Sequence, residues 1–368
     1  TIKVTEHSHS IFNIILVILS AILVTVALVF LVRQNIQLAN YTYVSYVLVA
    51  IVGSIYNFMG VQDAVLLFTE PNVRFGAELG AKGATILGIV INVIFLGLVF
   101  YKIWQQQKEL TELAHRYGKK VNVAVNAIFH NEGIAQVPEY LQFLKSINVD
   151  MITVGDPGVV QIMKNPDYSI PYYYDAAVLV TSSRQVNFWA KRGAIGAVIA
   201  REIPRAEMEI LASQVEVPIE VLVYGATCIH HSKRPLLQNY FNYIEKEESV
   251  EKRRGLFVSE PADEDSHYSI YQDINGTHIF ANNDVSLAPY LLELSQMGVP
   301  QWKFDGVLTP GDNFVKVVQL FDNARKEIEA GTWTVEKSAS LELQVRELHP
   351  EQRGLDAGFY ILNPEDVK

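Results

Sequence analysis

Hydrophobic and polar positions divide the chain into two parts. Three long stretches near its start carry no charged residue: Ile11–Val32 with 22 residues, Val44–Val61 with 18 and Gly83–Tyr101 with 19. A helix needs about 20 apolar residues to cross the hydrocarbon core of a bilayer. None of the three stretches shows the polar face of an amphipathic core helix. The pattern therefore predicts three transmembrane helices.

Buried core helices and a cleaved signal peptide are the alternatives to membrane spans. Residues 1–10 lack the basic start of a signal peptide, since they carry one Lys, one Glu and two His. Basic residues follow the third stretch, whereas the loop at 62–81 holds one Arg against three acidic residues. Because basic residues mark the cytoplasmic side of a membrane, we expect a membrane-anchored protein whose C-terminal domain is cytoplasmic.

Beyond residue 108 the pattern changes to amphipathic helices that alternate with apolar strands. It predicts helices at 109–118, 136–146, 182–192, 205–213, 288–296 and 313–330, and strands at 121–127, 151–155, 196–200, 219–223 and 302–304. Such alternation is typical of a parallel α/β fold. We expect a TIM-type parallel barrel, which need not be complete, preceded by an all-α transmembrane segment. An open doubly wound sheet is the alternative.

The same patterns predict three regions along the chain. These are a hydrophobic N-terminal region at 1–106, the barrel domain at 107–332 and a C-terminal extension at 333–368. Apolar residues are scattered among charges in the extension, which favours a small strand region. Asn275-Gly276 is typical of a tight hairpin turn.

Polar side chains follow the predicted strands at or just past their C-terminal ends. Loops begin there in every fold, so a single position carries little weight. A barrel, however, assembles its site at this face. The positions are Asn126, Asp156, Arg201-Glu202, Tyr224-Gly225 and Asp305.

The stretch from Gly225 to Phe241 has the densest candidate chemistry, because a polar turn there follows a buried strand. It holds the only cysteine, Cys228, with His230, Lys233 and Arg234 close by. Neighbouring positive charge favours a thiolate nucleophile, and a buried structural thiol is the alternative. Two adjacent imidazoles and one thiol make a poor metal spacing, so we expect no metal.

Two pairs of alternatives concern the basic residues. Arg201 either pairs with Glu202 or offers a bidentate fork to a carboxylate or phosphate. The basic run at Lys246 and 252–254 either meets a phosphate backbone or forms the solvated face of a helix, since acidic residues are interleaved with it. We assign catalytic roles to Cys228, Arg201 and Glu202, and substrate binding to Asn126, Asp156, His230, Lys233, Arg234 and Asp305.

The pattern Glu-x-x-x-x-Gly-x-x-Cys, from Glu220 to Cys228, resembles the signature of peptidase family U32, the collagenase-like proteins. Other segments agree in order and spacing, among them 125–131, 155–157, 200–202, 275–278, 283–284 and 303–306. The resemblance covers about residues 108–325. It is greatest to short Gram-positive-type members linked to hydroxylation of a tRNA wobble uridine. Members of the family begin directly with two βα units and carry no membrane segment, so the first hundred residues depart from it. If that region has a foreign origin, we expect a cytoplasmic protein.

The resemblance also implies a ligand and partners. Relatives in the hydroxylation pathways use prephenate, a dicarboxylate, and some carry an iron–sulfur cluster. Here Pro235 and the stretch 254–258 stand at the positions of the further cluster cysteines. One thiolate cannot hold a cluster, so we expect none, and we expect tRNA and a cluster-bearing paralogue as partners.

Three functions stay open at this point: a component of tRNA hydroxylation, a peptidase, and a non-catalytic partner subunit. No Ser-His-Asp, zincin or paired-carboxylate spacing supports the peptidase. The net charge of -10 slightly opposes a large nucleic-acid footprint.

Overall fold

The computed structural model describes residues 22–23, 26, 101–175, 180–309 and 311–367. The chain divides into two compact units, Thr1–Lys119 and Lys120–Lys368. In the first unit, residues 101–116 are helical, and the Thr111 hydroxyl donates to the Gln107 carbonyl at 2.8 Å.

The three predicted transmembrane helices lie almost wholly outside the described residues. Among the residues that are described, no helix has both the length and the apolar composition to cross a membrane. The predicted spans stay a prediction.

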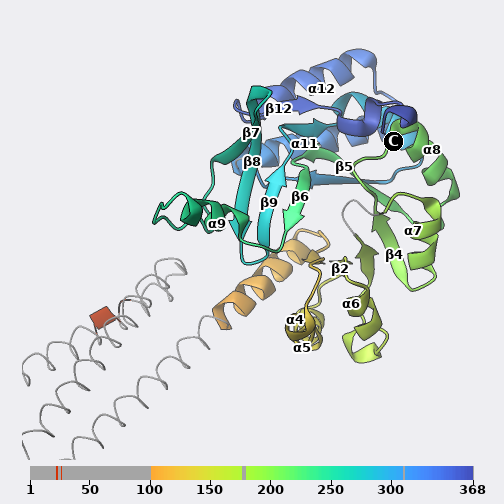
Figure 1. Ribbon diagram of the computed structural model, residues 1–368. Coiled ribbons are helices and arrows are strands. Elements are labelled where there is room, and N and C mark those ends of the chain that lie inside the picture. The colour runs from red at the N-terminus through yellow and green to blue at the C-terminus, as the bar shows by residue number, and fades with distance from the viewer. Residues whose placement is uncertain (1–21, 24–25, 27–100, 176–179, 310, 368) are drawn as a thin grey trace, which may run out of the picture. The chain divides into compact units, whose positions relative to one another are not determined.

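Six parallel strands follow one another in the sheet in the order in which they occur along the chain (Figure 1). They are β1 (Asn122–Val125), β2 (Met151–Val154), β3 (Tyr172–Tyr174), β4 (Ala194–Val198), β5 (Ile219–Gly225) and β11 (Gln301–Asp305). A doubly wound sheet would reverse its strand order midway, so that alternative is wrong. The described pairings include none between β1 and β11, and closure into a barrel stays a prediction.

Helices follow each of these strands along the chain, as the alternating pattern predicted. They are α4 (Asn131–Ile134), α5 (Val137–Ser146), α6 (Pro157–Ile162), α7 (Ser183–Ala190), α8 (Arg205–Gln214), α10 (Leu291–Gln296) and α11 (Gly311–Glu329), with short 3-10 turns η1 (Pro166–Tyr168) and η3 (Ala288–Tyr290). Local chemistry sets their starts. Ser182 and Gln185 form a capping box at α7, and the Asp156 carboxylate caps α6.

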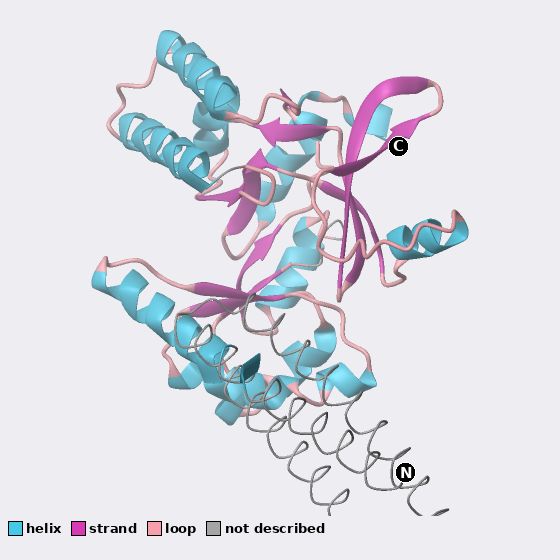
Figure 2. Ribbon diagram, turned by 90° about the vertical axis from the view of Figure 1, so that its left-hand side faces the viewer, coloured by secondary structure: helices cyan, strands magenta, loops and turns pink. Residues whose placement is uncertain are grey.

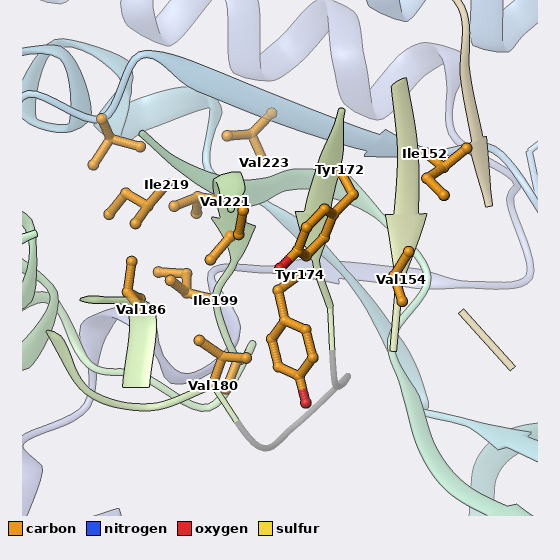
Figure 3. Packing of buried hydrophobic residues seen from close by; sticks show 14 of the residues in the cluster. Ile152, Val154, Tyr172, Tyr174, Val180, Val186, Ile199, Ile219, Val221 and Val223 are labelled. Atoms are coloured by element: carbon orange, nitrogen blue, oxygen red, sulfur yellow. The ribbon is translucent and has the colours of Figure 1, made fainter. Parts of the chain in front are cut away.

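One face of the parallel sheet packs against these helices and forms the main core. Alternate residues of β5 supply it, namely Ile219, Val221 and Val223, and all three are buried. Figure 3 shows them beside Ile199 and Val186, which come from β4's end and from α7. Strand side chains alternate between faces, so the residues between them point to the opposite face of the sheet.

The C-terminal extension is helical where we predicted strands. Thr334 caps α12 (Val335–Leu348), and Leu341 and Val345 bury its inner face. The short strand β12 (Gly354–Asp356) then pairs in parallel with β10 (Asn283–Ser286), which itself pairs antiparallel with β5. Two turns, η4 (Gly358–Ile361) and η5 (Pro364–Val367), end the described chain. Because β12 joins the main sheet, residues 333–367 belong to the same compact unit as the parallel strands.

A separate four-stranded antiparallel sheet lies in the order β6 (Cys228–Ser232), β9 (Gly276–Phe280), β8 (Asp263–Asp273) and β7 (Leu256–Glu260). Figure 1 labels these four strands near one another, and Figure 2 draws the strands of the protein in magenta after a turn of 90°. Helix α9 (Leu236–Tyr243) packs Leu237 against Ile270 of β8. The hairpin predicted at Asn275-Gly276 joins β8 to β9. The basic run from Lys246 to Arg254 lies in an irregular segment, so the expected helix face is wrong.

Candidate functional site

The face of the parallel sheet opposite the helices carries a polar cluster. Lys303 of β11 places its Nζ 3.5 Å from Asp175 Oδ2 and 3.4 Å from Glu220 Oε1. Both carboxylates are mostly buried, with side chains 10% and 19% exposed. Tyr173 lies on the same face, and its ring occupies the space that a Cβ on Gly196 would need. We call Tyr173, Asp175, Glu220, Gln301 and Lys303 the inner cluster.

Contacts within the inner cluster show that the sheet is strongly curled. Strands β3 and β11 are separated by β4 and β5, so a flat sheet would hold them about 14 Å apart at about 4.8 Å per strand. Yet Lys303 reaches Asp175 just past β3. Burial raises the pKa of Tyr173 on β3, and a side-chain hydrogen bond between Tyr173 and Gln301 on β11 lowers it in part. The strands therefore curve around the inner cluster.

The ends of β5 and β11 meet closely at one edge of this curved sheet. Gly225 pairs with Asp305, and a Cβ on Gly225 would collide with the Asp305 carbonyl. Gly155 plays a similar part between Asn126 and Asp175, where a Cβ would lie 2.7 Å from both carbonyl oxygens. Small residues thus draw neighbouring strand ends together.

Arg201, Cys228 and Asp305 lie near enough to one another at this edge for both charges to act on the thiol. Burial raises the pKa of the Cys228 thiol, while the charge of Arg201 lowers it and that of Asp305 raises it. The thiol donates to the His230 carbonyl at 3.4 Å. Burial thus outweighs the nearby positive charge, which favours the structural thiol of the two alternatives, and a catalytic role for Cys228 stays a prediction.

Arg201 is half-buried and, among the residues that the structure describes, its guanidinium has no hydrogen-bond or ion-pair partner. It lines a small cavity of about 20 Å³ with Ala200, Met208 and Leu222. Glu202 is exposed and does not pair with it. Of the two alternatives for Arg201, the free fork fits this geometry and the ion pair does not.

Asn126 and Asp156 end the neighbouring strands. The Asp156 carboxylate accepts hydrogen bonds from Gly158 N at 2.7 Å and Phe129 N at 2.9 Å, so both oxygens hold backbone. Asn126 is exposed at the end of β1. Asp305 uses Oδ1 for its own turn, accepting from Val307 N at 3.0 Å.

The remaining predicted residues lie away from the parallel strand ends. His230 is an exposed residue of β6, and Lys233 and Arg234 follow that strand at the turn into α9. His231 stacks on His278 with 4.6 Å between ring centroids. The stretch that we expected to be a loop is therefore an antiparallel strand, and only Cys228 at its start adjoins Arg201 and Asp305.

Sequence reasoning assigned no role to the inner cluster, although two of its members lay in the quoted motifs. Glu220 and Lys303 are charged residues inside otherwise apolar strands. A charge at an alternate position of a buried parallel strand marks the face away from the helices. That signal was available.

Two family models match this chain. The model of peptidase family U32 matches residues 102–368, and that of a domain of unknown function matches residues 1–112. The tRNA hydroxylation protein P2 of Bacillus subtilis is 34% identical over 259 residues, which cover 68% of this chain and 82% of the relative.

Two further relatives are more distant. The tRNA hydroxylation protein P1 of Bacillus subtilis is 25% identical, covering 60% of this chain and 52% of the relative. The tRNA hydroxylation protein P of Escherichia coli is 24% identical, covering 59% and 58%. The solved structure of the U32 peptidase Mk0906 aligns with a TM-score of 0.28 at 16% identity over 40% of this chain and 63% of that one, which is too low to support an argument.

Proposed function

Because the chain belongs to peptidase family U32, we propose that it takes part in the hydroxylation of a tRNA wobble uridine. The observation that carries this proposal is the 34% identity that extends over 82% of a tRNA hydroxylation protein. Two other tRNA hydroxylation proteins match at lower identity. We place the chain with its tRNA in the cytoplasm.

The parallel strands, in this proposal, form an arc of a TIM-type barrel whose strand ends bind a small carboxylate such as prephenate. The curled sheet and its sequential strand order support the arc. Lys303 is already neutralised by two carboxylates. Arg201 is the cation left for an anionic ligand, because its guanidinium has no partner among the described residues. A planar fork holds a carboxylate through two parallel hydrogen bonds.

The chain's own residues do not fit an iron–sulfur cluster. Such clusters need several thiolates, and the sequence supplies one. We propose that a paralogue with cluster ligands works beside this chain. The matches to both P1 and P2 of one organism are consistent with such a pair.

The inner cluster gives the site a means to hold or move a proton. Tyr173 is kept protonated by burial, which raises its pKa. Lys303 bridges Asp175 and Glu220 and so fixes both carboxylates near the strand ends. If the inner cluster acts on a bound ligand, the chain is a catalytic protein. If the inner cluster only stabilises the strands next to Arg201, the chain is a non-catalytic subunit.

The peptidase alternative lacks an activated nucleophile in this geometry. The Cys228 thiol has a raised pKa and donates to a backbone carbonyl. The imidazole of His231 stacks on His278 and its Nε2 lies 3.1 Å from the Asn275 carbonyl. A cysteine peptidase needs a base within hydrogen-bond reach of its sulfur.

The proposal is tested by mass spectrometry of tRNA nucleosides from a deletion strain complemented with variants of the full chain. Arg201→Ala removes charge and fork, and Arg201→Lys keeps only the charge. Loss of a charged hydrogen bond weakens binding about 10- to 100-fold, so hydroxylation should fall for both. Arg205→Ala is the matched control, because this exposed arginine only pairs with Glu293 on the surface.

Two results would contradict the proposal in different ways. If the deletion strain hydroxylates its tRNA as well as wild type, the chain takes no part in tRNA hydroxylation. If Arg201→Ala is present at normal protein levels and supports full hydroxylation, Arg201 does not bind a carboxylate. The chain is then better described as a non-catalytic subunit.

A further inference from the structure

A row of aromatic rings crosses the antiparallel sheet, in which the two imidazoles stack and the tyrosine ring is tilted by 35°. His231 of β6 is paired in register with His278 of β9, which is paired with Tyr271 of β8. The imidazoles are parallel within 13° at 4.6 Å, and Tyr271 lies 6.4 Å from His278. The Arg254 guanidinium lies over the far face of the row, 5.6 Å from the Tyr271 centroid. We call these four residues the stacking row.

The stacking row lies on the face of the sheet that α9 does not cover. Residues that alternate with it face α9: Thr277 accepts from Leu236 N at 2.9 Å, and Gln272 accepts from Gln238 N at 3.1 Å. Ile270 also points there, into the small core under α9. Side chains one position along the strand point the other way.

Hydrogen bonds hold the rings of the row in place. His231 Nε2 lies 3.1 Å from the Asn275 carbonyl, and His278 Nε2 lies 3.3 Å from Asp273 Oδ1. A fixed ring loses little conformational freedom when a ligand stacks on it. The row is therefore preorganised.

One end of the row is open. His231 is exposed, and β6 is the edge strand of its sheet. No further strand stands beyond it among the described residues, so one face of the imidazole is available to a planar group. Lys233 and Arg234 follow directly at the turn next to the hairpin at Gly276, and both are exposed.

The other end of the row leads to the candidate site. Arg254 Nη1 donates to the Val307 carbonyl at 2.7 Å, two residues past Asp305. Arg353 anchors the same face, donating from Nη1 to Ser269 Oγ at 2.7 Å while also holding Asp284. These contacts tie the antiparallel sheet to the loops at the parallel strand ends.

We propose that the stacking row binds an unpaired nucleobase of RNA, which continues the stack on His231 while Lys233 and Arg234 meet the adjacent phosphates. Every base has a face that stacks on aromatic rings, and Lys and Arg supply the electrostatic part of RNA binding. A single-stranded loop presents such bases, whereas a duplex does not. This inference rests on the proposed function, since it gives the chain a surface that holds the RNA at the end of the row away from the parallel strand ends.

The test measures binding of the full chain to a labelled RNA hairpin with a single-stranded loop, and to a fully paired RNA duplex as a control. Stacking on one ring is worth about 5- to 100-fold in affinity. We expect His231→Ala to weaken hairpin binding by about tenfold or more, and His231→Phe to retain it. Tyr243→Ala is the matched control, because this aromatic side chain is 85% exposed on α9, which covers the opposite face. Lys233→Ala should weaken binding and lower the salt dependence by about one unit of slope.

Each outcome supports or overturns the inference. Equal binding of His231→Ala and wild type overturns it, as does loss of binding with His231→Phe. If the chain binds the duplex as strongly as the hairpin, no unpaired base stacks on His231 and the inference is overturned. If wild type binds no RNA and His231→Ala instead disrupts association with a protein partner, the surface is a protein interface and the inference fails. The proposed function is judged separately, by the effect of Arg201→Ala on tRNA nucleosides.

Discussion

Cys228 shows why a sequence neighbourhood does not fix the chemistry of a side chain. Lys233 and Arg234 stand close in sequence, but they lie past the far end of β6, whereas Cys228 begins that strand. The charge that lowers its pKa comes from Arg201, and desolvation outweighs it. A strand rises by about 3.3 Å per residue. Over five residues the charges of Lys233 and Arg234 are therefore too far from the thiol to lower its pKa much.

The first prediction follows from this single thiol. Burial raises the pKa of Cys228 above its ordinary value of 9.0, so little thiolate exists at neutral pH. We expect iodoacetamide to alkylate the folded chain slowly at neutral pH and faster as the pH rises past 9.0. Mass spectrometry gives the rate, and the urea-unfolded chain is the control. Rapid alkylation at neutral pH in the folded chain would reinstate the activated nucleophile.

Among the strands and turns, Gly225 has one of the most restricted positions. It has a φ of +120°, a conformation that side chains rarely adopt, and its missing Cβ lets the Asp305 carbonyl approach. The end of β5 can thus pair with β11 right up to the candidate site. Backbone geometry there decides where Cys228 and Asp305 stand.

A matched pair of glycine substitutions tests this. Gly255 also has a positive φ, of +79°, but nothing lies within 4 Å of its Cβ position. We expect Gly255→Ala to lower the free energy of unfolding by about 1 to 2 kcal/mol through strain alone. Gly225→Ala should cost clearly more, because the collision forces β5 and β11 apart. Urea unfolding compares the two, and equal losses would show that the strand ends give way without cost.

The hydrophobic periodicity predicted the strands that form apolar runs and the helices that have an apolar face. The strands β1, β2, β4, β5 and β11 are long enough to show as apolar runs, and their helices show amphipathic spacing. It missed β3, because three tyrosines carry polar hydroxyls and do not read as an apolar run. It also missed β6, β7 and the long β8, whose polar residues alternate with few apolar ones. In α12 only Leu341 and Val345 are buried, which is too sparse a face to distinguish from a strand region.

The candidate site was predicted in part for the same physical reason. Strand ends can be located from the pattern, so Arg201 and Asp305 were found. Glu220 and Lys303 stand out in the sequence as charged residues of buried strands, but the contact of Lys303 with Asp175 depends on the curvature of the sheet, which no local pattern encodes. The stacking row depends on the register of β6, β9 and β8, which is likewise set by tertiary pairing.

At the scale of the whole molecule, a buried polar network closes the C-terminal segment onto the sheet. Tyr224 Oη lies 2.8 Å from His349 Nδ1 and 3.1 Å from Thr309 Oγ1. His349 Nε2 is 3.7 Å from Asp284 Oδ2, and Arg353 pairs with the same carboxylate at 2.5 Å. These residues come from β5, β10, the loop after β11 and the segment after α12. Breaking one of them leaves buried partners unsatisfied, at about 1 to 3 kcal/mol each.

The last prediction is a pH dependence of stability that this network imposes. Burial lowers the pKa of His349 below its ordinary value of 6.5, the nearby Asp284 opposes that change, and Arg353 and Arg346 add to it. The unfolded chain therefore binds a proton near pH 6.5 that the folded chain still excludes. Stability from the neutral imidazole is fully present above this pH and is lost as the pH falls through the folded pKa, by at most about 1.4 kcal/mol per pH unit. Thermal melts between neutral and mildly acidic pH should show the loss.

Two variants separate this histidine from the other titrating groups. His349→Gln keeps a neutral polar group beside Tyr224 and should be less stable at neutral pH, yet lose less stability on acidification than wild type. His267→Gln is the control, because it removes an exposed histidine of β8. If the stability of His349→Gln falls with pH as steeply as that of wild type, carboxylates cause the pH dependence of stability. The network would then hold the C-terminal segment by hydrogen bonds alone, without a proton-linked contribution from His349.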